Sequence, residues 1–456
     1  MTTTLPRPSI GAPAAYRFPV ARRFQLDNGI AVLAYDLPGQ LVVSATLLLD
    51  APETAEPRDL EGVATLALRC ADEGTVPHPG AAFTEAVEDQ GATLGGAAHL
   101  WSTQLAVEAP ATRLDAALAL LAEAVAQPAY ADEDVARHVA LRLTEIEHML
   151  ADPKSSSVIA LRAAVTSADS RMHRPGAGRP DTVASLSAAD LHAFHDRWWT
   201  PRGATLIVAG QLPDGVDAML QRDFGTWHPA VGPEGPDLPT TAEAEPAPGV
   251  VWVIDHPDAV QAAIAIGTLT PPRADPAWSL TQVGTAALGG SFGSRLNTVL
   301  REQRGFTYGA SCGLSASRDC SLFGVHTNCR TEVAAQAVTT ALELLDLDAR
   351  PLTPDEVRSA VDYLVGVAPL RYDTADAIAA QAAALVEAGM PTTWIDEHHD
   401  RMRSATAASA TAALAPWIAP QRLHTVIAGR ADELVPALGE AGLDPRVVDV
   451  AGQPRG

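Results

Sequence analysis

Short apolar runs punctuated by turn residues predict strands in both halves of the chain. Six runs rich in Val, Ile, Leu and Ala are predicted strands: residues 29–37, 41–50 and 205–210 in the first half, and 250–255, 262–269 and 424–429 in the second. The first two are separated by Pro-Gly-Gln, which favours a turn. Each half therefore opens with a pair of strands and closes with a further strand.

Segments with helical periodicity lie between the predicted strands, and their landmarks recur in the second half at a nearly fixed offset. In each half one helix runs to a proline and a second helix starts soon after it: Leu114–Val125, Pro128 and Asp132 in the first half, and Val333–Leu345, Pro351 and Pro354 in the second. Pro128 and Pro351 are 223 residues apart, and PRGATLIVAG (201–210) matches PQRLHTVIAG (420–429) at an offset of 219. Landmarks at nearly one offset indicate an internal duplication.

The order of these elements predicts an α+β fold. We expect two homologous domains, each a mainly antiparallel sheet with helices packed on one face. A stretch dense in Pro, Gly, Ala and Glu joins them near the middle of the chain. The predicted divisions are an N-terminal arm (1–21), a first domain (22–224), a linker (225–249), a second domain (250–440) and a tail (441–456).

Composition narrows the class of protein. The chain has 456 residues and a net charge of −23, which disfavours nucleic acid and anionic membranes as partners. The acidity reflects solubility or, alternatively, an acidic interior that attracts basic peptides. Its 32 basic residues include a single lysine, Lys154. Four cysteines without CxxC spacing, no apolar signal segment and no long apolar run predict a cytoplasmic location.

The segment LEGVATLALRCADEGT (60–75) carries a recognisable frame. Gly62, Ala64, Gly74 and Thr75 stand at set places around a predicted helix. The segment resembles the active-site helix of the pitrilysin/insulinase (inverzincin) zinc peptidases, which carries H-x-x-E-H inside this frame. Through this resemblance, the first ligand, the general base and the second ligand correspond to Thr65, Leu68 and Arg69.

These replacements remove the chemistry of the motif. Two histidines at i and i+4 bind zinc from one helix face, and the glutamate activates the metal-bound water. Thr65 is a poor ligand, Leu68 cannot accept a proton, and Arg69 places a permanent cation where Zn²⁺ belongs. The family's third ligand, a glutamate in a later helix, is expected at Leu143, with Glu145 two residues away. The sequence thus predicts no metal and no catalytic residue in this chain.

Other polar groupings are weaker candidates. Three sets have spacings that a metal site could use, and we interpret them as solvated helix faces or helix ends: His138 with Glu145 and His148, His192 with His195, and His398 with His399.

The second half keeps a specific motif of its own. The stretch LGGSFGSRLNTVLREQRGFTYGA (288–310) resembles the family's second-domain signature, a turn of small residues followed by S-R-L and R-E-x-R-G-x-x-Y. The resemblance implies that Arg304 and Tyr308 contact the substrate. Arg supplies a fork of donors for a peptide carbonyl, and Tyr supplies a neutral donor. Their spacing fits one helix face, but Gly305 makes a turn equally compatible. Both residues could instead be packing and surface residues of a degenerate domain.

The retained and lost features together predict a divided enzyme. The resemblance implies a non-catalytic, substrate-binding subunit of a heteromeric zinc metallopeptidase, whose homologous partner bears H-x-x-E-H and the zinc and closes with it around a peptide. The alternative is a peptidase-like binding or scaffold subunit without a proteolytic role. A stand-alone enzyme finds no support, because no Ser/His/Asp or Cys/His constellation is evident.

Overall fold

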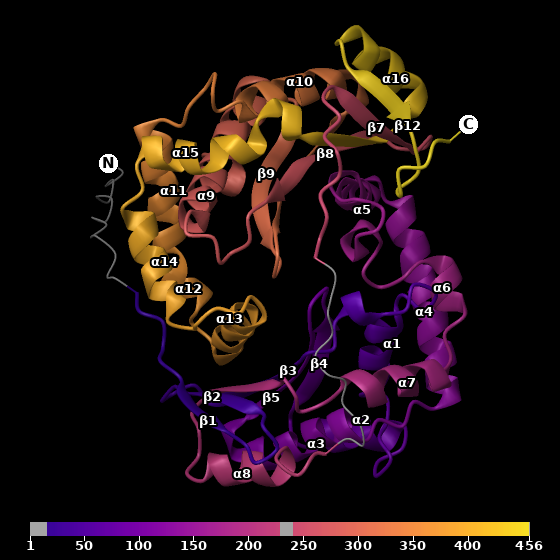
Figure 1. Cartoon of the computed structure of the whole chain (residues 1–456), viewed down its shortest axis with the longest axis vertical. Helices are drawn as coiled ribbons and strands as arrows, with labels where there is room; N and C mark the ends of the chain where they lie inside the picture. Colours follow the sequence, from indigo (N-terminus) through magenta and orange to yellow (C-terminus); the bar gives the residue numbers. More distant parts are fainter. Residues whose placement is uncertain (1–15, 229–239, 456) are drawn as a thin grey trace, which may run out of the picture.

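The computed structural model describes residues 16–228 and 240–455, which form two α+β halves built on similar mixed sheets (Figure 1). The strand orders are β1-β2-β6-β3-β5-β4 and β12-β7-β11-β8-β10-β9. Five strands of one sheet thus have counterparts in the other, as the internal duplication predicts. Most pairs are antiparallel, but β2 runs parallel to β6, and β7 runs parallel to both β11 and β12.

The six predicted strands are confirmed nearly to the residue, because each apolar run supplies the buried positions of a strand. The first sheet contains β1 (Arg22–Gln25), β2 (Ala31–Asp36), β3 (Val42–Leu49), β4 (Thr93–Ala98), β5 (Thr103–Pro110) and β6 (Thr205–Gly210). The second contains β7 (Val250–Asp255), β8 (Gln261–Thr270), β9 (Thr307–Ala316), β10 (Ser321–Arg330), β11 (His424–Gly429) and β12 (Asp444–Val447).

Helices surround both sheets. Those of the first half are α1 (Val63–Cys70), α2 (Ala81–Glu88), α3 (Leu114–Ala126), α4 (Asp132–Ala151), α5 (Pro153–Val165), α6 (Pro180–Ala184), α7 (Ala188–Trp198) and α8 (Val216–Asp223). Those of the second are α9 (Trp278–Thr285), α10 (Ala334–Leu345), α11 (Pro354–Gly366), α12 (Ala368–Arg371), α13 (Ala375–Glu387), α14 (Trp394–Arg403), α15 (Ala407–Ile418) and α16 (Ala431–Glu440). None of the helices in the described ranges is both long and apolar enough to cross a membrane.

The two halves exchange one helix each. Helix α5 of the first half packs on β8 and β11 of the second sheet, and α13 of the second half packs on β3 and β6 of the first (Figure 1). The two helices begin at residues 153 and 375, 222 residues apart, so they are counterparts in the duplication. Each sheet is therefore covered on both faces, one by its own helices and one by the exchanged helix. The predicted α+β fold is confirmed, and the exchanged helix adds cover on the second face of each sheet.

Three described segments lie at or beyond the predicted domain boundaries, which stay a prediction. Within the predicted arm, residues 16–21 are described, and Phe18 is buried against the α13 side of the first sheet. The linker lies partly outside the described residues, at 229–239, but Ala244 donates a backbone hydrogen bond to the end of α5 at Val165. Strand β12 falls in the predicted tail and extends the second sheet.

Candidate functional site

The glycines of the frame around α1 each have a packing explanation. Gly62 precedes the helix with φ +107°, and a Cβ there would lie 3.1–3.3 Å from Val183, Gly178 and Ala177. A Cβ on Gly74 would lie 2.4 Å from the backbone nitrogen of Gly80. Only glycine fits such close backbone approaches. The frame therefore fixes where α1 sits against its neighbours.

An ion-pair cluster occupies the face of α1 on which a zinc site would be built. Arg69 Nη1 donates to both carboxylate oxygens of Glu145 in α4, at 2.8 and 2.9 Å. Arg142 Nη1 donates to the same carboxylate at 2.9 Å. These hydrogen bonds, that from Arg69 foremost, lower the pKa of Glu145, so the carboxylate is ionised. Two arginines facing one glutamate leave a net positive charge there.

The remaining positions are apolar or weakly polar. Leu68 is 7% exposed and belongs to the core of the first half. Leu143, the predicted third-ligand position, packs against that same core, whereas Glu145 is the α4 residue that contacts Arg69. Thr65 is half-buried on α1.

The other histidine sets do not assemble into metal sites. His138 Nε2 lies 2.6 Å from Glu73, which also pairs with Arg137, while Glu145 is held by Arg69. His195 is buried against the backbone carbonyl of Val125. Across the ranges that the structure describes, no three His, Cys, Asp or Glu side chains are grouped in a way that could hold a metal ion.

His398 and His399 likewise have packing roles. The ring of His398 stacks on Trp394 at 4.3 Å, and its Nδ1 lies 2.8 Å from Ser279 Oγ. Burial lowers the pKa of His398 to about 3, so this histidine is neutral at physiological pH.

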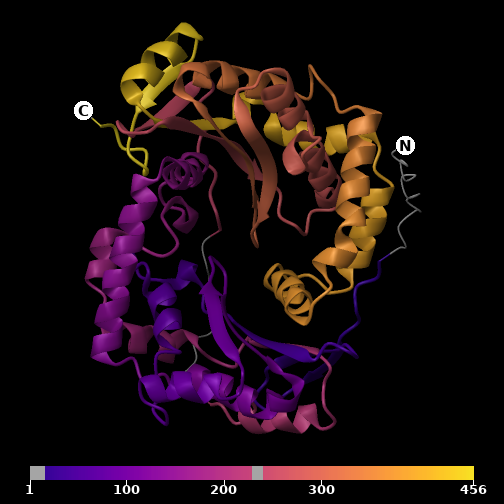
Figure 2. The same cartoon turned by 180° about the vertical axis from the view of Figure 1, so that it is seen from behind.

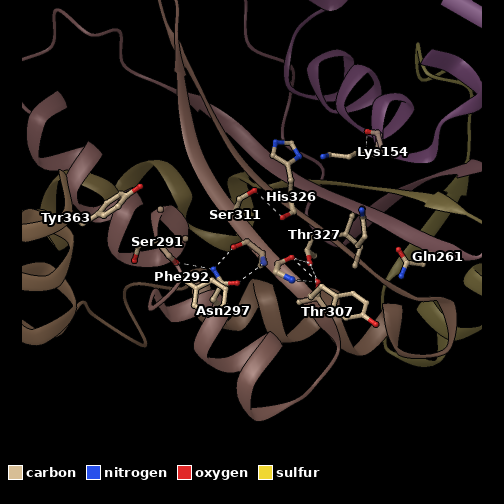
Figure 3. Close-up of a pocket in the computed structure, with 18 residues that line it drawn as sticks. Lys154, Gln261, Ser291, Phe292, Asn297, Thr307, Ser311, His326, Thr327 and Tyr363 are labelled. Carbon is tan, nitrogen blue, oxygen red and sulfur yellow. Dashed lines mark hydrogen bonds between the residues drawn. The ribbon is translucent and has the colours of Figure 1, made fainter. Parts of the chain in front are cut away.

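A cavity of about 540 Å³ in the second half is the main candidate for binding (Figure 3). Its walls come from the turn 289–292, from the start of β9 and from the residues of β10 that lie beside it. Helix α5 of the other half contributes Lys154 and Ser157. None of the 18 lining residues is acidic, despite the net charge of −23. The alternative of an acidic interior finds no support at this cavity.

Hydrogen bonds and close packing hold the cavity walls in place. Asn297 Nδ2 donates to the carbonyl of Ala310 at 2.8 Å, and Ala310 N donates back to Asn297 Oδ1 at 2.9 Å. Thr327 Oγ1 lies 2.9 Å from Thr307 Oγ1 across the strands. A Cβ on Gly289 would lie 2.3 Å from Cys312 Cβ, so the turn requires glycine.

The two residues of the R-G-x-x-Y motif occupy different surroundings. Arg304 ends the helical segment η5 (Asn297–Gln303), and Gly305 then turns the chain with φ +63° into β9. Tyr308 is the second residue of that strand, lines the cavity and is 91% exposed. Arg304 is exposed but does not line the cavity. The turn, rather than a single helix face, is therefore the arrangement that the structure contains.

Lys154 gives one wall of the cavity a positive charge, and His326 lies beside it. Figure 3 shows the two side chains beside each other, opposite Ser291 and Tyr363. Burial, reinforced by the Lys154 ammonium, lowers the pKa of His326, which keeps the imidazole neutral. No motif in the sequence points to either residue. The one available signal is that Lys154 is the sole lysine of the chain.

Two family models match consecutive parts of the sequence. The model described as insulinase, peptidase family M16, matches residues 31–177, and the model described as the peptidase M16 inactive domain matches residues 185–364. The chain belongs to the M16 peptidase family. The predicted resemblance is thereby confirmed.

Relatives and solved structures agree with this M16 assignment. The chain is 27% identical over 350 residues to an uncharacterised zinc protease of Mycobacterium tuberculosis, covering 76% of this chain and 78% of the relative. A crystal structure of a peptidase M16 inactive domain from Pseudomonas fluorescens superposes with a TM-score of 0.82 at 20% identity, covering 90% and 98% of the two chains. A chain of complex III2 from Candida albicans gives a TM-score of 0.76 at 13% identity, covering 92% and 99%. These structural likenesses concern the fold.

The residues of this M16 chain do not fit the zinc ion that the family motif holds. The second-ligand position is an arginine already paired with Glu145, and the adjacent Arg142 adds a second cation. A divalent cation there would be repelled by both guanidinium groups. Leu68 occupies the position of the general base, and its side chain cannot take a proton from water.

Proposed function

We propose that this chain is the non-catalytic, substrate-binding subunit of a heteromeric zinc metallopeptidase, with a homologous partner supplying H-x-x-E-H and the zinc. The observation that carries the proposal is the contrast between the two halves. The face of α1 is filled by the Arg69–Glu145–Arg142 cluster, while the second half keeps an open cavity with Tyr308 at its edge.

The cavity and its border suit an extended peptide. Within residues 16–228 and 240–455, β9 is the edge strand of the second sheet and pairs with β10 alone. An unpaired strand edge can accept a peptide as an added strand through main-chain hydrogen bonds. Figures 1 and 2 show β9 reaching from its sheet toward the first half, so a peptide along it would lie between the two halves.

The polar groups of the cavity favour peptide amides. Asn328, Gln261 and Ser311 contribute amides and a hydroxyl from its walls, and Tyr308 offers an exposed phenol. Such neutral groups can donate to carbonyls and accept from N–H groups. Arg304 lies four residues before Tyr308 and does not line the cavity. It would contact the peptide only when the binding of a partner or substrate brings Arg304 and the peptide together.

The proposal is tested by assaying an M16 partner with an intact H-x-x-E-H, in the presence of zinc, alone and mixed with this chain. We expect cleavage of an unfolded peptide to increase on mixing. Tyr308→Phe or Arg304→Ala should lower kcat/KM of the mixture by about 10²-fold, if each contacts the transition state. The matched control is Arg113→Ala, because Arg113 is an exposed arginine of the first half, and this variant should leave the rate unchanged.

Two results would contradict this role. The pairing fails if the mixture cleaves no faster than the partner alone. The assignment of the motif fails if the pair is active and both Tyr308→Phe and Arg304→Ala retain the full rate.

The alternative is a binding or scaffold subunit without proteolysis, and the fold shared with a chain of complex III2 from Candida albicans is compatible with it. Cleavage by the mixture with the zinc-bearing partner separates the two functions, because a binding or scaffold subunit without a proteolytic role would not raise the partner's rate. A cytoplasmic location stays a prediction from the sequence.

A further inference from the structure

A second cavity, of about 330 Å³, lies where the two halves meet. The hairpin β4–β5 contributes His99 and Gln104, the β9–β10 turn contributes Arg318, and α13 contributes Glu387. Arg273, in the loop between β8 and α9, completes the wall. The cavity thus draws on both halves and on an exchanged helix.

Arg273 has hydrogen-bonding groups that the described residues leave unused. Its Nε and Nη1 are buried and have no hydrogen-bond partner in the ranges 16–228 and 240–455. Burial lowers the pKa of Arg273 from its ordinary value, which reflects the cost of desolvating the cation. Buried polar groups normally have a partner, and an unpaired buried cation is especially costly.

Both arginines of this cavity are backed by tryptophan. The guanidinium of Arg273 lies over Trp278, 5.3 Å from the ring centroid, and that of Arg318 lies over Trp101 at 5.9 Å. Trp101 is itself fixed, because its Nε1 donates to Ser317 Oγ at 2.7 Å. Stacking holds a guanidinium by its face and leaves the N–H groups at its edge free for planar or tetrahedral oxyanions.

The charge balance of the cavity is positive. Glu387 is the single carboxylate in its lining, and its recorded hydrogen bond comes from Ser102 Oγ at 2.8 Å rather than from an arginine. Arg318 also lies within electrostatic range of Asp50, and burial raises the pKa of that carboxyl. The volume is roughly ten times that of one water molecule in the liquid, so an oxyanion with its waters fits.

We propose that this cavity binds an oxyanion between Arg273 and Arg318, joining the two halves of the chain. The ligand is a phosphate-like or carboxylate group, because both present several acceptors to a guanidinium fork. This inference does not depend on the proposed role as a peptidase subunit.

The test is a titration of the whole chain with inorganic phosphate at constant ionic strength, followed by calorimetry and by thermal unfolding. Saturable binding and a rise in Tm are expected for the wild type. Arg273→Gln and Arg318→Gln should each weaken phosphate binding by at least about tenfold, the usual scale for charged hydrogen bonds. Arg273→Lys keeps the positive charge but lacks the guanidinium fork, so its affinity for phosphate should lie between those of the wild type and Arg273→Gln. Arg58→Gln, on an exposed arginine elsewhere, is the control and should bind as the wild type does.

A second arm identifies the source of the oxyanion. A peptide with a free C-terminal carboxylate is compared with its amide for displacement of phosphate. Displacement by the acid alone assigns the site to a peptide terminus, and phosphate binding without displacement assigns it to a free oxyanion. The inference is overturned if the wild type binds neither probe saturably, or if the two Gln variants bind phosphate as tightly as Arg58→Gln does. Arg318 is exposed, so its variant remains informative even if Arg273→Gln does not fold.

Discussion

Histidines at positions 65 and 69 should turn the α1–α4 contact into a zinc site. In the variant Thr65→His/Arg69→His the two histidines stand at i and i+4, on the helix face that already meets Glu145. Both replaced side chains are partly exposed, so the core is not disturbed. Leu68 is left in place, because it is 7% exposed and a glutamate there would be buried without a partner.

The expected change in stability follows from the exposure of the lost ion pair. The Arg69 and Glu145 side chains are 35% and 41% exposed, so losing their pair costs about 0–1 kcal/mol. Zinc at about 100 times its Kd then stabilises the folded state by about 2.7 kcal/mol. For domains of this size the gain corresponds to a rise in Tm of about 5–10 °C. The wild type should show no saturable rise, since Arg69 holds the ligand position.

The assay combines thermal unfolding in a zinc titration with measurement of bound metal. Adding Glu145→Gln to the double variant should abolish the zinc-dependent rise in Tm, since it removes the third ligand. Adding Leu143→Glu instead tests the position predicted from the sequence. If the double variant still binds zinc after Glu145→Gln, the geometric assignment of Glu145 as third ligand is refuted. If the double variant binds zinc only once Leu143→Glu is added, the position predicted from the sequence supplies the third ligand.

Two further predictions concern packing. Leu161→Ala in α5 and Ile378→Ala in α13 should each lower the free energy of unfolding by about 2–5 kcal/mol, because each side chain is buried under the other half's sheet. Chemical denaturation measures this change. The control is Leu141→Ala, because Leu141 is 50% exposed and its loss should cost under about 0.5 kcal/mol. Equal losses for all three variants would contradict the exchange of helices. Gly289→Ala should cost about 1–3 kcal/mol, because its Cβ would overlap Cys312. Gly293→Ala meets no atom within 4 Å and is the control, so similar losses for both glycines would show that the close contact is not the cause.

The sequence predicts elements well where the pattern is local. The run 250–255 is β7 to the residue, and Leu114–Val125 is α3 within one residue at its end. The exchange of α5 and α13 could not be predicted in this way. Helix α13 is rich in alanine and α5 combines serine with alanine, and neither sequence specifies which sheet the helix covers. That choice is made by the tertiary packing.

The site shows the same limit. Frame residues such as Gly62 were recognisable because close backbone approach permits only glycine. The sequence did not identify Glu145 as the partner of Arg69, because counting residues along two helices leaves an uncertainty of two positions. Those two positions separate the core-facing Leu143 from the charged Glu145. Arg273 belongs to no sequence motif, and it is distinguished by two buried nitrogens that have no hydrogen-bond partner among the described residues.

The cluster of Arg69, Glu145 and Arg142 suggests why the first half keeps its shape without the family's metal chemistry. A bound zinc ties the motif helix to the helix of the third ligand, and here hydrogen bonds of 2.8–2.9 Å join α1 to α4 through Glu145. Arg142 further anchors this contact, since its Nε donates to the carbonyl of Ala177 next to the Gly178 that packs against Gly62. The link is weaker than metal coordination but needs no ion. The geometry of the frame can therefore persist without a metal ligand at position 69, as the proposed substrate-binding role requires.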